Sequence, residues 1–359
     1  MKRRTIIFFD AAFPPPFIGG KEKQAYLLAF ALSNFRYNVV ALTPLRNFFS
    51  FTFLYTDQNL IRISLPYPLL LICLIFLRLF SNLIHIHTPS RKGLLILITS
   101  KLLFYTTIFK LPNMFIIGQS KIYDFILTAF VDKLICLELN SYEYSIHLRS
   151  RFPSFLTSFQ PILASNLVTQ NSQIDISFPP PDCEVKLLFL ARLVPQKNPL
   201  DLIQLAFHLN QISSSFRFRI IVVGSGSCYS SLREQSALSY SNVIFDFQGF
   251  QSDVMNYLIN SHFLISLSSK EGMSNSILEA LSIGLPILST RVASYRHLLG
   301  KYSHVCTFEC HDMKRLSSLI YYFISHPHKY HEFSKYLHSR SCIFSPNTIG
   351  SFYSDLYSS

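Results

Sequence analysis

The chain of 359 residues contains no tryptophan and is poor in charge. Only 14% of its residues are Asp, Glu, Lys or Arg, whereas a typical soluble domain is about a quarter charged. Hydrophobic residues make up 49% of the chain and aromatic residues 15%. Disordered segments are polar and poor in aromatics, so this composition excludes disorder for most of the chain.

No apolar run is long enough to cross a bilayer. The strongest run, Leu65–Leu77, contains two prolines and ends at Arg78, whereas a spanning helix needs about 20 apolar residues. The basic N-terminus is followed by only four apolar residues before Asp10. A secretion signal needs an apolar region of about 7–15 residues, so we expect a cytoplasmic protein.

Disulfide and metal chemistry have little support in the sequence. Seven cysteines are scattered along the chain, an odd set that predicts reduced thiols. His304, Cys306, Cys310 and His311 lie close in sequence but lack the spacing of a zinc site. A second histidine tract, residues 326–331, is expected in a loop between helices. We therefore expect no metal.

The chain carries a net charge of +12, with an isoelectric point of about 9.3. Such an excess of positive charge favours an anionic partner, which could be a nucleic acid, an anionic lipid or a phosphorylated small molecule. The net charge alone does not distinguish these classes of partner.

Short β-branched or aromatic runs alternate with helical patterns in both halves of the chain. We expect strands at 5–9, 38–43, 60–64, 83–87, 113–117, 133–137, 186–190, 218–223, 242–247, 263–267, 286–289 and 304–308. Helices are expected at 21–34, 68–80, 91–104, 199–212, 229–239, 275–283, 312–325 and 352–357. This alternation predicts an α/β fold with two parallel sheets covered by helices.

A polar and proline-rich stretch interrupts this rhythm near the middle of the chain. We expect a first domain over residues 1–165, a linker over 166–183 and a second domain over 184–340. Residues 341–359 are expected to return to the first domain as a terminal helix. Two open α/β sheets would place a ligand between them, at the C-terminal ends of their strands.

Glu271 and Glu279 lie where a strand passes into a helix that is expected to begin near Asn275. Backbone N–H groups at residues 273–276 would point at an anion bound there. The alternative reading is purely structural, because Ser276 and Glu279 fit the S-x-x-E pattern of a helix capping box.

Arg192 and Lys197 lie in the turn that follows the expected strand 186–190. Arginine can bind phosphate oxygens through two hydrogen bonds, and lysine adds a point charge. An ordinary solvated turn is the alternative for this segment taken alone.

Together these two segments resemble the family 4 glycosyltransferases of the GT-B fold. That family carries the patterns G-R-L-x-x-x-K-G and E-G-x-x-x-x-x-L-E-A-x-x-x-G-x-P. The residues that match in register are Arg192, Lys197, Glu271, Gly272, Leu278, Glu279, Ala280, Gly284 and Pro286. The resemblance covers the C-terminal half and is weaker over the N-terminal half. It departs from the pattern at Ala191, Asn198 and Ser274, where the family prefers glycine, and at Gln119, near which many members carry a histidine.

Other segments add to the resemblance. Gly19-Gly20 resembles the family's N-terminal glycine loop, and His85 and His87, on one face of a strand, resemble its I-H-x-H strand end. Phe250 follows a strand whose end contacts the nucleotide base in the family. The turn 223–226 resembles its V-G-x-G turn, for which we expect a structural role; it is not a phosphate-binding Walker loop.

The resemblance implies a retaining, metal-independent enzyme that uses a nucleotide-sugar as donor substrate, with no other cofactor. It implies catalytic roles for Glu271, Arg192, Lys197 and His87. It implies donor binding by Gly20, Phe250, Gly272, Met273, Ser274, Asn275 and Glu279. In this reading Glu271 bonds a hydroxyl of the donor sugar and Glu279 bonds the ribose hydroxyls.

The apolar composition and basic excess favour a lipid-linked saccharide acceptor at the inner face of a bacterial membrane, in lipopolysaccharide or capsule biosynthesis. Residues 69–80 with Arg78, or 91–110 with their basic residues, could then lie on the membrane surface. For residues 69–77, buried packing between strands is the role that we expect instead. No nucleic-acid partner is expected. Two other classes stay open: a GT-B-like nucleotide-sugar epimerase or phosphorylase, and a non-catalytic basic protein that binds membranes.

Overall fold

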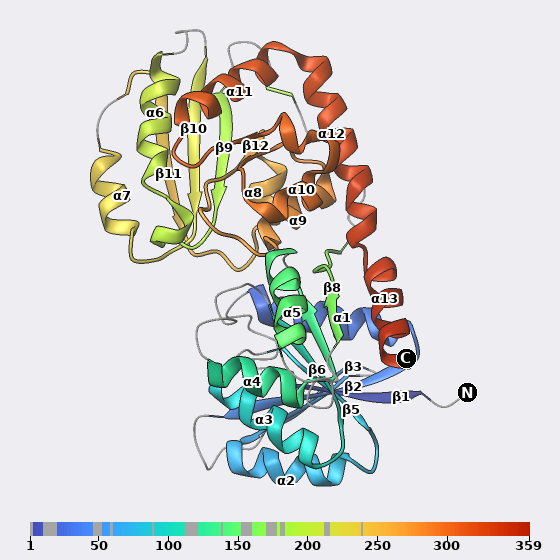
Figure 1. Cartoon of the computed structure of the whole chain (residues 1–359). Coiled ribbons are helices and arrows are strands. Elements are labelled where there is room, and N and C mark those ends of the chain that lie inside the picture. The colour runs from blue at the N-terminus through green and yellow to red at the C-terminus, as the bar shows by residue number, and fades with distance from the viewer. Residues whose placement is uncertain are drawn as a thin grey trace. The chain divides into compact units, whose positions relative to one another are not determined.

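The computed structural model describes residues 3–9, 20–45, 52–57, 60–87, 90–111, 121–137, 139–151, 160–169, 178–179, 184–211, 216–237 and 240–359. The chain divides into two compact units (Figure 1). Unit 1 comprises residues 1–167 and 344–359, and unit 2 comprises residues 168–343.

Unit 1 is built on an eight-stranded sheet of order β3-β4-β2-β1-β5-β6-β7-β8. Its strands are β1 (Arg4–Phe9), β2 (Tyr37–Leu45), β3 (Thr52–Asp57), β4 (Leu60–Pro66), β5 (Leu83–Ile86), β6 (Thr106–Leu111), β7 (Lys133–Cys136) and β8 (Gln160–Leu163). All neighbours pair in parallel except β3 and β4, which are antiparallel. Its helices are α1 (Gly20–Ser33), α2 (Tyr67–Leu77), α3 (Arg91–Leu102), α4 (Lys121–Phe130), α5 (Leu139–Arg151) and α13 (Pro346–Ser358).

The sheet of unit 1 is apolar on both faces, as a parallel sheet covered by helices requires. Along β1, Ile7 and Phe9 belong to a core shared with α2, α3 and α4, while Ile6 and Phe8 belong to a second core shared with α1 and α13. The C-terminal helix α13 packs along α1, so the end of the chain completes the second core.

Unit 2 holds a six-stranded parallel sheet of order β11-β10-β9-β12-β13-β14. Its strands are β9 (Glu184–Leu190), β10 (Arg217–Val223), β11 (Val243–Gly249), β12 (Phe263–Ser266), β13 (Ile287–Thr290) and β14 (Thr307–Phe308). Its helices are α6 (Asp201–Gln211), α7 (Tyr229–Gln235), α8 (Met255–Ile259), α9 (Asn275–Ile283), α10 (Ala293–Leu299), α11 (Met313–Ser325) and α12 (Pro327–Ser341). From β9 the chain adds β10 and β11 on one side, and it then crosses over to add β12, β13 and β14 on the other side. In open α/β folds, ligands bind at the point where the strand order switches in this way, here between β9 and β12.

The predicted α/β class with two largely parallel sheets is confirmed, and the helix predicted at 275–283 has those bounds in α9. The strand predicted at 113–117 lies outside the described residues, and β6, α4 and α5 were not predicted. The loop predicted around the 326–331 histidines is wrong, because Pro327 begins α12; proline suits a first helical turn, where its missing N–H costs nothing. The strand predicted at 304–308 is only Thr307–Phe308, because residues 300–304 form a 3-10 helix.

Within the described part of the chain, no helix combines the length and the apolar character that crossing a bilayer requires.

Candidate active site

Two loops meet at the switch point of unit 2. The first follows β9 and carries Arg192 and Lys197; the second follows β12 and carries Glu271. Strands β9 and β12 are parallel neighbours, so their carboxyl ends lie side by side. The fold therefore brings together two segments that lie more than seventy residues apart in the sequence.

The Lys197 ammonium forms an ion pair with Oε2 of Glu271. Ser268 Oγ donates a second hydrogen bond, of 3.1 Å, to the same carboxylate oxygen. The side chains of Lys197 and Glu271 are only 13% and 15% exposed, so solvent screens this pair weakly. Arg192 lies nearby and is exposed.

Burial, and then the positive charge of Arg192, lower the pKa of Lys197 to about 8. The ammonium is therefore still charged at neutral pH, but it is far easier to deprotonate than an exposed lysine. An anion bound between Arg192 and Lys197 would relieve the repulsion between the two cations.

Backbone and amide contacts hold the two loops together. Gln196 Nε2 donates to the Lys270 carbonyl at 2.7 Å, and the Ser269 amide donates to the Gln196 carbonyl at 3.0 Å. Asn198 Nδ2 donates to the Leu267 carbonyl at 2.9 Å. The sequence pattern alone did not identify Gln196 or Ser268 as site residues, because each is marked only as a polar side chain soon after a buried strand.

Asn198 has φ 46°, in the left-handed region. Asparagine tolerates this conformation better than most residues, which explains why it can occupy a position where the pattern prefers glycine.

A glycine turn after β10 supports the Arg192 loop from behind. The Leu193 amide donates to the Ser225 carbonyl at 2.9 Å, and the Cys228 amide donates to the Leu193 carbonyl at 2.8 Å. A Cβ at Gly226 would lie 2.3 Å from the Leu193 carbonyl oxygen. Only glycine allows this approach, so the turn has the structural role that its sequence predicted.

Helix α9 begins beside the second loop. Its N-cap is Ser274, whose side chain makes no capping hydrogen bond and instead lies 3.0 Å from the hydroxyl of Ser276. Ser276 is the second helical residue, so Ser276 and Glu279 do not form a capping box, and that alternative is wrong. The positive end of the helix dipole faces the region of Gly272 and Met273.

The second loop is anchored by β13 and α10. Thr290 Oγ1 donates to the Ser268 carbonyl at 2.6 Å, and Ser294 Oγ donates to the Glu271 carbonyl at 3.1 Å. These contacts hold the backbone that carries the Glu271 carboxylate.

The remaining predicted donor residues of unit 2 lie near this edge in sequence and topology. Met273 is buried, and Phe250 follows the end of β11 with its ring 65% exposed. Glu279 lies on the second turn of α9 and is half-buried.

His87 and Gly20 belong to unit 1. Gly20 begins α1, while Gly19 and Gln119 lie outside the described residues. His87 follows β5, and its ring lies tilted against that of His85 with centroids 4.0 Å apart. Among the described residues, its Nε2 has no hydrogen-bond partner. Burial, then His85 and Lys110, hold the pKa of His87 well below its ordinary value, so the ring is neutral at pH 7. The structure thus groups Arg192, Lys197 and Glu271, and places His87 in the other unit.

The histidine and cysteine cluster near residue 306 does not converge. Cys306 Sγ donates to the Tyr302 carbonyl at 3.0 Å, His311 Nδ1 lies 3.0 Å from the Asp201 carboxylate, and Cys310 is exposed. Among the residues that the structure describes, no three His, Cys, Asp or Glu side chains lie close enough to hold a metal ion.

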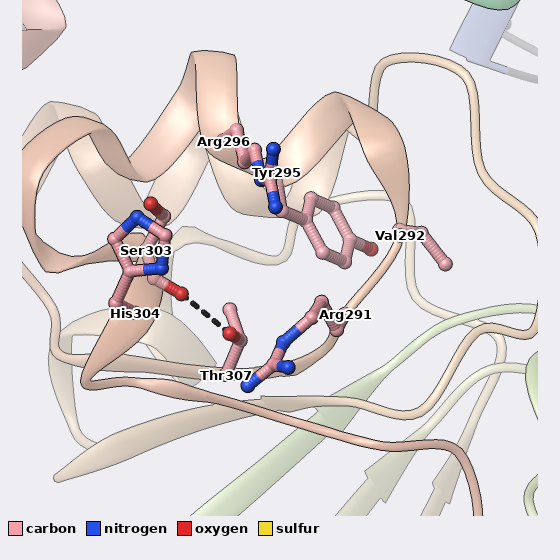
Figure 2. A pocket seen from close by; sticks show the side chains of 7 residues that line it. All are labelled: Arg291, Val292, Tyr295, Arg296, Ser303, His304 and Thr307. Atoms are coloured by element: carbon pink, nitrogen blue, oxygen red, sulfur yellow. Dashed lines mark hydrogen bonds between the residues drawn. The ribbon is translucent and has the colours of Figure 1, made fainter.

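Two hollows in unit 2 lie away from the paired loops. Figure 2 shows the smaller, about 30 Å³, between Arg291, Tyr295, His304 and Thr307; it is too small for a sugar. The larger, about 430 Å³, is a polar hollow over β9, β10 and α8 in which Arg219 pairs with Glu184 and Asp246. Neither contains Arg192, Lys197 or Glu271.

Residues 172–340, just under half of the chain, match the sequence model of the family described as Glycosyl transferases group 1. No curated protein matches the chain. The chain therefore carries a glycosyltransferase domain over most of unit 2.

Solved structures of known glycosyltransferases are similar over nearly the whole chain. Anabaena Alr3699/HepE, solved with UDP and glucose, is 16% identical, with 99% of each chain covered and a TM-score of 0.73. Sucrose-phosphate synthase from Thermosynechococcus elongatus is 14% identical, with 99% of this chain and 98% of that chain covered and a TM-score of 0.73. Trehalose-6-phosphate synthase OtsA is 11% identical, with 98% and 99% covered and a TM-score of 0.74. These similarities show the GT-B fold.

Proposed function

We propose that this chain is a retaining glycosyltransferase of the family 4 type, which moves a sugar from a nucleotide-sugar to a saccharide acceptor. The observation that carries the proposal is the pairing of Lys197 with Glu271 where β9 and β12 end. It joins the two sequence patterns of the resemblance at the switch point of the sheet. HepE was solved with UDP-glucose, which supports a nucleotide-sugar as donor.

In this proposal unit 2 binds the donor. The diphosphate lies against Arg192, Lys197 and the N-terminus of α9, whose charges stabilise the negative charge that develops as the nucleotide leaves. The sugar lies beside Glu271, whose carboxylate accepts a hydroxyl hydrogen bond. Glu279 binds the ribose hydroxyls, and Phe250 contributes to the base pocket with Gly272, Met273, Ser274 and Asn275.

Unit 1 binds the acceptor, with Gly20 and His87 at the β1–β5 switch point of its sheet. His87 is neutral, and no described residue hydrogen-bonds its Nε2, so this nitrogen can form one hydrogen bond with an acceptor hydroxyl. We infer a lipid-linked saccharide acceptor in the assembly of a bacterial surface polysaccharide, at the inner face of the membrane. The excess of basic and apolar residues supports this acceptor.

A thermal-shift screen of nucleoside diphosphates and nucleotide-sugars tests the donor assignment. A ligand that binds only the folded state raises the melting temperature, by an amount that grows with its affinity. We expect one nucleotide series to give a clear shift in the wild type and a much smaller shift in Arg192→Ala at the same ligand concentration. If no nucleotide shifts the wild type, the donor assignment is wrong.

Turnover tests the activity itself. Removing one charge that stabilises a leaving group in a water-poor site costs roughly 10²-fold in rate, so we expect that loss for Lys197→Ala with the preferred donor. Arg219→Ala, which removes a cation from the polar hollow, is the matched control and should retain activity. Equal losses in both variants would contradict a specific role for Lys197.

A further inference from the structure

Helix α2 is apolar on every side, yet half of it is exposed. Leu70 and Leu74 are fully buried against the sheet of unit 1, whereas Ile72, Ile75 and Phe76 are 50%, 55% and 64% exposed. A helix that is apolar all round is normally buried on all sides. The folded unit therefore leaves the outer side of α2 uncovered.

The exposed side continues onto two neighbouring turns. Leu79 and Phe80, directly after α2, are 82% and 71% exposed, and Leu102 and Phe104, at the end of α3, are 69% and 83% exposed. Arg78 joins the turns, because its Nε donates to the Leu103 carbonyl at 3.1 Å and its Nη2 lies 3.4 Å from the Phe104 carbonyl. We call Phe76, Leu79, Phe80, Leu102 and Phe104 the apolar rim.

Phe104 occupies a position that normally favours glycine. Its φ is 59°, and the Tyr105 amide donates to the Ser100 carbonyl at 3.0 Å, which closes the helix as a C-terminal glycine does. A bulky residue is disfavoured in this conformation, and the ring is not compensated by burial. Folding alone does not account for a phenylalanine here.

The charges in the sequence segment that carries the rim are of one sign. Residues 58–123 contain seven Lys or Arg and no Asp or Glu. Lys101, on the last turn of α3, is paired with Asp132. Arg78 lies between the two exposed turns and stacks over Tyr105, 5.6 Å from its ring centroid.

We propose that the apolar rim docks unit 1 on an anionic lipid surface, into which its side chains insert while Arg78 lies at the level of the phosphates. Interfacial helices bind membranes through this combination of apolar insertion and basic flanks. A second copy of the chain would instead bring two predominantly basic surfaces together, which like charges oppose. The proposal rests on the lipid-linked acceptor of the proposed function, and it is tested without turnover.

The rim lies at one edge of the sheet of unit 1. Residues 78–82 and 103–105 lead directly into β5 and β6, so the rim lies at the edge where these strands begin. Figure 1 shows α2 and α3 together on one side of the sheet. His87 lies at the opposite edge, where β5 ends, so docking through the rim does not cover the carboxyl ends of the strands.

Sedimentation of the full chain with vesicles tests this proposal. The probes are vesicles of phosphatidylcholine alone, and of phosphatidylcholine and phosphatidylglycerol in equal parts. We expect the wild type to sediment with the anionic vesicles and much less with the neutral ones. Leu79→Ser with Phe80→Ser removes two large apolar side chains that would leave water on docking, so the double variant should bind the anionic vesicles more weakly, by about tenfold or more.

Phe104→Gly separates docking from folding. Glycine adopts φ 59° without strain, so this variant should melt at the same or a higher temperature while its vesicle affinity falls. Phe207→Ser is the matched control, because Phe207 on α6 of unit 2 is also 52% exposed and should not matter. Nucleotide-induced thermal shifts in all variants report the donor site independently of docking.

The proposal is overturned if the wild type does not sediment with anionic vesicles, or if the rim variants sediment as the wild type does. It is also overturned if the chain dimerises in sedimentation velocity and the same variants abolish the dimer. If the chain binds the vesicles but no nucleotide raises its melting temperature, the docking role of the apolar rim stands and the proposed activity is refuted.

Discussion

The ammonium group of Lys197 is largely buried, lies near the positive charge of Arg192 and pairs with the carboxylate of Glu271. Its pKa of about 8 follows from burial and the charge of Arg192, while Glu271 holds the ammonium in place. The spacing of Arg192 and Lys197 in the sequence predicted a phosphate-binding turn. It did not predict that Gln196 and Ser269 would join that turn to the Glu271 loop, because these hydrogen bonds depend on which strands become neighbours.

We expect kcat/KM to fall as the pH rises through about 8. Lys197 is protonated below its pKa of about 8 and loses its charge above it, so stabilisation of the leaving diphosphate is lost on the alkaline side. Lys197→Arg should move this limb to higher pH, because arginine stays charged. The pH dependence of kcat/KM, measured for the wild type and for Lys197→Arg, checks both expectations. If kcat/KM falls at the same pH in both proteins, a group other than Lys197 titrates there.

Glu279→Gln should weaken nucleotide binding by roughly tenfold or more, because a hydrogen bond to a charged group contributes about 1.5–3 kcal/mol. A carboxylate can accept from both ribose hydroxyls, whereas the amide offers one acceptor oxygen. Since no capping box exists here, the melting temperature should stay within a few degrees, as for most surface substitutions. Calorimetric titration measures the affinity, and wild-type affinity would remove Glu279 from the site.

At the scale of elements, the loops after β9, β10 and β12 act as one assembly. The helix bounds of α9 and the strands of unit 2 were largely predictable, since apolar runs, Gly284 and Pro286 mark their ends locally. The close approach of the glycine turn to Leu193 was not predictable, because the two segments come together only when β9 and β10 pair in the folded sheet.

Gly226→Ala should displace the Arg192 loop, since its Cβ would lie 2.3 Å from the Leu193 carbonyl oxygen. Overpacking of this kind costs about 1–3 kcal/mol of stability, and we expect nucleotide affinity to fall with it. Gly350→Ala is the control: its Cβ would lie 2.6 Å from the Phe35 ring, but in unit 1. If Gly350→Ala reduces nucleotide affinity as much as Gly226→Ala does, the effect is not local to the loop.

Helix α13 contributes a buried hydrogen bond to unit 1, in which His85 Nδ1 lies 2.7 Å from the hydroxyl of Tyr357. Tyr357→Phe should destabilise unit 1 by about 1–3 kcal/mol, because a buried ring nitrogen loses its partner. Hydrogen exchange of the β5 amides reports this unit alone. Tyr321→Phe, on an exposed tyrosine of α11, should leave exchange unchanged; protection equal to the wild type in Tyr357→Phe would contradict the structural role of α13.

At the scale of the whole molecule, the alternation of strands and helices was enough to predict two α/β sheets. It did not predict the antiparallel β3, which pairs only with β4 at the edge of the sheet, or the helices α4 and α5. The histidines at 326–331 were misread as a loop because the proline among them marks turns as well as the first turn of a helix. What the sequence motifs predicted most specifically is the candidate site in unit 2, where chemistry constrains residue type and spacing together.

The central claim is that the paired loops of unit 2 bind the diphosphate of a nucleotide-sugar. Calorimetric titration of the full chain with UDP, the nucleotide bound in HepE, tests it most directly. We predict saturable binding by the wild type and by Arg219→Ala, and affinity at least tenfold weaker in Arg192→Ala, which loses a bidentate partner of phosphate worth about 1.5–3 kcal/mol. Wild-type affinity in a folded Arg192→Ala, or equal weakening in Arg219→Ala, would contradict the account.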